Sequence, residues 1–219
     1  MEDCQHQFLL SPMILLMKNL TMTTHHTNDP AMSPLPFRRI VTGHSSTGKA
    51  IVTNDDVLYP VNFFDSSSLA SSTDFGLTLL FRSEAEASST NDGKMIASRA
   101  SISISNTVPF RDPYKTTMQI VEPGHINWRL LDLPPHSTAP LHRTTSVDLG
   151  VVLKGEVVLE LDDGVERILK EHDSVVQRGT IHAWHNRTDS IVRMMFIILP
   201  SDAVISHDGQ ALDDIGIEV

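Results

Sequence analysis

Alternation of apolar and polar residues dominates the chain from about residue 38 onward and predicts strands rather than helices. Residues 126–133 alternate before a Pro-Pro pair, residues 156–161 alternate charged with apolar side chains, and residues 193–199 are nearly all apolar. A period of two places successive side chains on opposite faces of a strand, and a short apolar run is typical of a strand buried on both faces. No segment carries a long helical repeat, so the pattern predicts an all-β protein.

Turn signals separate these strands at short intervals. Asp162-Asp163-Gly164 is a strong hairpin signal, Gly155 permits a tight turn, and a Gly/Ser/Thr-rich stretch at 43–48 predicts a further hairpin. The Ser-rich segments 65–74 and 84–106 are interpreted as loops. Further strands are expected over residues 57–64, 75–82, 149–153, 165–169, 175–176, 183–184 and 191–199. Many short strands joined by Gly/Asp turns indicate an antiparallel barrel or sandwich.

Composition adds limits to this picture. The chain has 219 residues, of which 40% are apolar and 20% charged, an ordinary globular balance with enough length for one sizeable core. Its net charge of -10 argues against nucleic acid as a partner, because phosphate binding needs clustered Lys and Arg. Cys4 is the only cysteine, so no intramolecular disulfide can form, and a cytoplasmic location is the simplest interpretation.

The organisation along the chain divides into three parts. Residues 1–33 contain a ten-residue apolar run, too short to span a membrane, followed by a polar stretch, so we expect a flexible N-terminal extension and no membrane partner. Residues 34–125 should supply strands and loops that pack on a barrel. Residues 126–219 should form the barrel core.

Two polar clusters flank the most strongly β-patterned hairpin. His142 and Asp148 lie six residues apart, so a continuous strand would place both on one face, and His182 and Asn186 form a second even-spaced pair. Convergence of His142, Asp148 and His182 would give two imidazoles and one carboxylate, a donor set that leaves metal positions open. The alternative is a polar barrel interior held by internal hydrogen bonds.

The same residues resemble the two motifs of the cupin superfamily. The first motif, G-x5-H-x-H-x3,4-E-x6-G, is similar to a stretch in which His142 stands at the first histidine, Thr144 at the second histidine, Asp148 at the glutamate and Gly155 at the final glycine. The second motif, G-x5-P-x-G-x2-H-x3-N, is matched by Gly179, His182 and Asn186. Gln177 replaces its proline, and Glu171 replaces its opening glycine. The resemblance implies a cupin-type, jelly-roll-like antiparallel β-barrel.

The pattern looks closest to small fungal monocupins of polyketide gene clusters, which are described as cupin-domain-containing oxidoreductases. That resemblance implies a metal-assisted step on a polyketide-derived intermediate, either oxidation or a dehydration that leads to an aromatic ring. The expected ion is Fe(II), with Zn or Mn as alternatives. Thr144 in place of a histidine weakens the ligand set. This favours the alternative of a metal-free cupin that binds a small molecule, or of a non-catalytic cupin.

The remaining candidates belong to the pocket around the expected metal. His136, in a loop beside two prolines, is expected either to act as acid or base or to be a solvated loop histidine. The expected substrate-pocket residues are Thr144, Trp128, Gln177, Trp184 and Asn186. Core packing is the alternative for the tryptophans, and bonding to the loop backbone is the alternative for Asn186. The partner is a small molecule, and a homodimer that covers edge strands is compatible with this fold.

Overall fold

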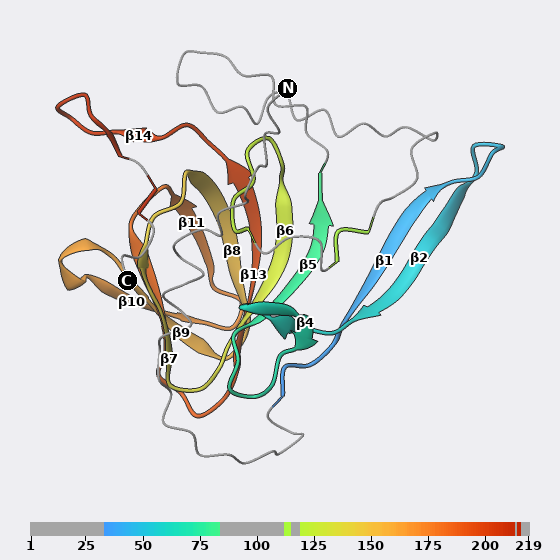
Figure 1. Ribbon diagram of the computed structural model, residues 1–219, viewed down its shortest axis with the longest axis horizontal. Helices are drawn as coiled ribbons and strands as arrows, with labels where there is room; N and C mark the ends of the chain where they lie inside the picture. Colours follow the sequence, from blue (N-terminus) through green and yellow to red (C-terminus); the bar gives the residue numbers. More distant parts are fainter. Residues whose placement is uncertain (1–32, 84–111, 115–118, 213, 216–219) are drawn as a thin grey trace, which may run out of the picture.

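The computed structural model describes residues 33–83, 112–114, 119–212 and 214–215, and within them it is nearly all β. Residues 1–32 of the N-terminal extension expected over 1–33, and the loop expected at 84–106, lie outside the described residues. Figure 1 shows two sheets facing each other, with a long hairpin projecting from one side.

The longer strands are β1 (Phe37–His44), β2 (Ala50–Leu58), β4 (Asp65–Leu69), β5 (Gly76–Arg82), β6 (Asn127–Leu133), β7 (Ser137–His142), β8 (Ser146–Lys154), β9 (Glu156–Glu160), β10 (Glu166–Lys170), β11 (Ser174–Arg178), β12 (His182–Asn186) and β13 (Val192–Pro200). Three two-residue strands complete the set: β3 (Val61–Asn62), β14 (Val204–Ile205) and β15 (Ala211–Leu212).

The two main sheets are antiparallel throughout. One has four strands in the order β10-β9-β12-β7, and the other has seven in the order β11-β8-β13-β6-β5-β3-β4. Sheet neighbours that are distant in sequence, such as β13 between β8 and β6, are typical of a jelly-roll arrangement. The prediction of an all-β, antiparallel, jelly-roll-like barrel is confirmed. No helix among the described residues is long and apolar enough to cross a membrane.

The core lies between these sheets because the strands alternate as the sequence predicted. In β8 and β13 every second residue is buried. Residues 193–199 differ in one respect from the expected strand buried on both faces: the odd positions are half-buried. A second, smaller cluster of Leu58, Leu80 and Leu130 packs with Trp128 and Met195 and shields the outer face of the seven-stranded sheet.

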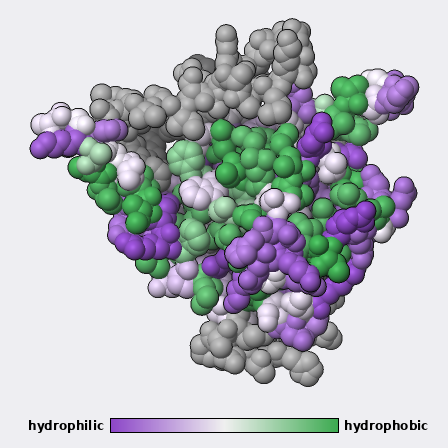
Figure 2. All heavy atoms as spheres, turned by 180° about the vertical axis from the view of Figure 1, so that it is seen from behind, coloured by the Kyte–Doolittle hydropathy of each residue, from purple (hydrophilic) through white to green (hydrophobic). Residues whose placement is uncertain are grey.

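The turns follow their glycines and aspartates. Asp163 and Gly164 both have positive φ between β9 and β10, which confirms the predicted hairpin. The hairpin β1–β2 also forms, and its strands carry both apolar and polar side chains on the surface in Figure 2. One prediction was wrong: strand β4 occupies half of the Ser-rich segment 65–74 that was interpreted as a loop.

Candidate active site

A pocket opens between the two sheets and is lined by both. Apolar and aromatic side chains, including Phe75, Leu131 and Trp184, form most of its wall. Four ionisable side chains join them: His142, Asp148, His182 and Arg129. A largely apolar cavity with a few converging polar groups is the usual form of a small-molecule site.

His142 and His182 meet because strands β7 and β12 pair in register at these two residues. Their ring centroids lie 4.1 Å apart. Each ring is fixed in the same way: Nδ1 of His142 donates to the Pro140 carbonyl at 2.7 Å, and Nδ1 of His182 donates to the Thr180 carbonyl at 3.0 Å. With the proton on Nδ1, the Nε2 atom of each ring carries a lone pair.

Burial keeps both imidazoles neutral. It lowers the pKa of His142, against the opposing effect of the hydrogen bond to Pro140. Burial and the charge that His142 would carry together lower the pKa of His182 to about 3. Both rings are therefore bases without charge at neutral pH. The amide nitrogen of Gln177 lies 2.7 Å from Nε2 of His182 and also contacts Nδ1. Gln177 therefore lies against both nitrogens of the His182 ring.

Asp148 enters the pocket from the other sheet. Its carboxylate accepts a hydrogen bond from the Ser146 hydroxyl at 2.8 Å, and that hydroxyl also contacts Thr144 at 2.9 Å. Burial raises the pKa of Asp148 to about 6, although Ser146 and Arg129 favour the charged form. A protonated fraction of this carboxyl group is therefore present near neutral pH, which is uncommon for an aspartate.

The structure does not bring the three expected metal ligands within coordinating distance of one another. Among the described residues, only Glu160, Glu166 and His185 form a group of three whose ligand atoms all lie within 4.8 Å of each other. Strand β7 ends at His142, β8 begins at Ser146, and the chain changes sheets in between, so His142 and Asp148 enter the pocket from opposite sheets. The even spacing of His142 and Asp148 assumed one continuous strand, and that assumption was wrong.

The side chains as placed therefore do not fit a three-ligand metal centre. The two histidines do have the tautomer that a divalent ion requires, with Nε2 unprotonated. The group formed by Glu160, Glu166 and His185 is partly exposed, and Arg187 already pairs with Glu166. Nothing in either group selects iron over zinc or manganese.

Arg129 is the pocket residue that the sequence analysis missed. It lies on β6, is 3% exposed, and donates from Nη2 to the Gln119 carbonyl at 2.6 Å. Its Nε and Nη1 atoms are buried and have no hydrogen-bond partner. Burial lowers its pKa to about 10, so it remains a cation at neutral pH. The alternation of residues 126–133 already placed Arg129 on one face with Leu131, and this was the available signal.

The other expected site residues divide between the pocket and its surroundings. Trp184 lines the pocket, but Trp128 packs in the outer cluster around Leu130. Thr144 and Gln177 are buried beside Asp148 and His182 without lining the cavity.

His136 and Asn186 lie outside the pocket. The His136 side chain is 64% exposed and pairs with Asp189 at 2.7 Å, so the structure corrects its expected role as the pocket's acid or base. Asn186 is 1% exposed and bonds to the backbone of two loops, the alternative weighed from the sequence.

Comparison with known proteins agrees with this architecture. Residues 129–198 match the family model described as the cupin domain. Phomopsin biosynthesis cluster protein D from Diaporthe leptostromiformis is 42% identical over 109 residues, which cover 49% of this chain and 57% of that protein. Cupin-domain-containing oxidoreductase virC from Hypocrea virens is 39% identical over 83 residues, or 36% of this chain and 43% of that protein. The chain thus spans about half the length of the curated relatives it matches.

Among solved structures, the cupin domain of an XRE family transcriptional regulator from Enterobacter cloacae is similar over 34% of this chain and 80% of that one, with 23% identity and a TM-score of 0.30. The curated relatives are fungal biosynthesis-cluster proteins and cupin-domain-containing oxidoreductases.

Proposed function

We propose that this protein is an enzyme of fungal secondary-metabolite biosynthesis that binds a small, mainly apolar intermediate in the pocket and moves protons on it. The observation that carries the proposal is the pairing of a neutral, oriented imidazole with a protonatable carboxyl group inside one apolar cavity. Groups whose environments push their pKa values in opposite directions are typical of an acid–base pair. The names of the relatives support the setting in biosynthesis.

His142 is the base of the pair. Its Nδ1 proton is committed to the Pro140 carbonyl, so Nε2 accepts a proton from the carbon next to a substrate carbonyl. His182 lies beside His142, and a positive charge on one ring disfavours a positive charge on the other. Gln177 contacts the ring of His182, so we assign the role of base to His142.

Asp148 is the acid. Its protonated form donates to a hydroxyl group that leaves as water from the β-carbon, while the electrons of the broken C–H bond form the new double bond. Each turnover adds one proton to His142 and removes one proton from Asp148. The pair is ready for another turnover once a proton returns from His142 to Asp148 through solvent. Such eliminations convert a reduced polyketide-like chain toward a conjugated or aromatic product.

A second candidate is metal-assisted oxidation, favoured by the matched tautomers of His142 and His182 and by the oxidoreductase names of several relatives. A divalent ion bound there would polarise a carbonyl or bind dioxygen. The two candidates separate experimentally through the metal content of purified protein, and through the dependence of turnover on dioxygen.

The test uses a small β-hydroxy ketone as substrate in deuterated buffer. We expect exchange at the α-carbon and loss of water, both followed by NMR, at rates above those of buffer alone. His142→Gln should lower both rates by roughly 100-fold or more, the usual contribution of a positioned base. His136→Ala is the matched control and should leave them unchanged. Equal rates for wild type and His142→Gln would remove His142 as the base.

A further inference from the structure

Arg129 lines the pocket, and two of its guanidinium nitrogens have no hydrogen-bond acceptor among the described residues. The nitrogens Nε and Nη1 are buried, and no described atom accepts a hydrogen bond from them. The third nitrogen, Nη2, donates to the Gln119 carbonyl. Leaving charged donors unpaired away from water is costly, more so than for neutral groups. A buried arginine in this state is expected to have a partner that arrives from outside the chain.

The acidic side chains near Arg129 each accept a hydrogen bond from another side chain. Oε2 of Glu122 accepts from Arg82 at 2.7 Å, whereas its Oε1 is buried without a partner among the described residues, and Asp148 accepts from Ser146 at 2.8 Å. Both interact with Arg129 through their charge, yet neither lies within hydrogen-bonding distance of its guanidinium nitrogens. The charge of Arg129 is thus partly balanced, but its donors remain available.

We infer that the pocket recognises a ligand through a carboxylate group, which Arg129 binds, and that the substrate is an acid with an apolar body. This inference rests on the proposed function and names the class of its substrate. The planar guanidinium fork matches a carboxylate better than a neutral oxygen, and the pairing is strongest where water is excluded. The wall of Phe75, Leu77, Leu131 and Ile198 suits the rest of such a molecule.

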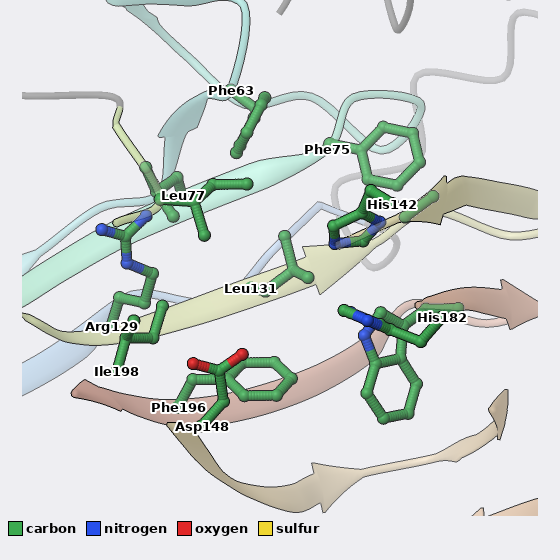
Figure 3. A pocket seen from close by; sticks show the side chains of 13 residues that line it. Phe63, Phe75, Leu77, Arg129, Leu131, His142, Asp148, His182, Phe196 and Ile198 are labelled. Atoms are coloured by element: carbon green, nitrogen blue, oxygen red, sulfur yellow. The ribbon is translucent and has the colours of Figure 1, made fainter. Parts of the chain in front are cut away.

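The geometry also gives the ligand a direction. Figure 3 shows Arg129 on the opposite side of the pocket from His142 and His182, with Leu131 between them. An acid anchored at Arg129 therefore extends over Leu131 toward the imidazoles. The pocket volume of about 60 Å³ has room for roughly four to six water-sized groups, and the pocket is open to solvent, so the end of a longer chain can extend out of it.

Binding of two isosteric probes tests the inference without any turnover. Hexanoate and hexanamide differ in charge but hardly in shape, and both can be titrated at pH 7.5 by calorimetry and by NMR line shifts. We expect wild-type protein to bind hexanoate roughly 10- to 100-fold more tightly than hexanamide, the range for hydrogen bonds to a charged partner. Arg129→Met should abolish this preference, and Arg129→Lys, which keeps the charge but loses the fork, should retain part of it.

Two controls keep the outcome decisive. Arg38→Met removes an exposed arginine paired with Asp55 and should leave the preference intact. Arg129→Met should keep a cooperative thermal melt, which shows that a lost preference is a loss of recognition in a folded protein. Equal affinity of wild type for both probes would overturn the inference, as would a preference that survives Arg129→Met.

If Arg129 only compensates the charge of Glu122, Arg129→Lys keeps that charge and binds hexanoate as tightly as wild type does. That pattern also overturns the inference. Because these titrations involve no reaction, they can fail while His142→Gln still loses turnover, and they can succeed where the β-hydroxy ketone is not turned over. The two proposals therefore stand or fall separately.

Discussion

Replacement of Asn186 by alanine should be among the most destabilising single changes in the barrel. The side chain is 1% exposed, and its amide nitrogen donates to the carbonyls of Leu133, Pro134 and Ser190 at 3.0, 2.9 and 2.8 Å. Its oxygen accepts from the backbone nitrogen and the hydroxyl of Thr188 at 3.0 and 2.8 Å. One side chain thus joins the β6–β7 and β12–β13 loops.

The magnitude follows from what the alanine leaves behind. Two amide hydrogens and two acceptor contacts give about four hydrogen bonds, each worth about 1 kcal/mol, and the buried carbonyls that lose their donor gain no water in exchange. We expect a loss of about 4 kcal/mol, a large share of the 5–15 kcal/mol that typically holds a domain folded. With a urea m-value of about 2 kcal/mol/M, the midpoint should fall by about 2 M.

Urea titration followed by tryptophan fluorescence measures this change, since Trp184 is 3% exposed in the core. Asn186→Asp keeps the shape but replaces the donor by a carboxylate facing three carbonyls, so it should destabilise at least as much at pH 7. Asn54→Ala, on the projecting β2 strand, is the matched control and should stay within about 0.5 kcal/mol. A loss below about 1 kcal/mol for Asn186→Ala would refute the reasoning.

Two further predictions concern Asp148 and Gly150, which both lie on β8. Because burial raises the pKa of Asp148 from 3.8 to about 6, wild-type protein loses stability as pH rises through that interval, where the folded state binds more protons than the unfolded state. In chelator-treated protein, Asp148→Asn should be as stable as wild type below about pH 4 and up to about 3 kcal/mol more stable above pH 6. A stability difference that stays constant across this pH range in thermal melts would contradict the raised pKa of Asp148. Gly150→Ala should lower the free energy of unfolding by about 1–3 kcal/mol in urea titrations, because the new Cβ would lie 2.7 Å from the Phe196 ring and 2.9 Å from Val175. If the variant is as stable as wild type, the Phe196 ring moves aside freely and the prediction is wrong.

Part of the site was predicted from the sequence, and the parts that were not depend on how the strands are arranged in space. His142 and His182 were predicted to meet, and strand pairing does bring their rings together. Asp148 was expected to share a strand face with His142, but the chain changes sheets between them, so the two residues face the pocket from opposite sheets. Asn186 follows His182 on the same strand, yet its position at the strand end directs it to the loops instead of the pocket.

Alternation and turn residues determine the strands of this protein, since the period of two and the positive φ of Asp163 and Gly164 are local properties of the chain. Which side chains share the pocket is decided only by the tertiary structure. The sequence marks Arg129 as one polar residue in a strand, whereas its unpaired donors exist only because two sheets close over it. Local pattern sets which way a side chain points, and the packing of the sheets sets what it meets there.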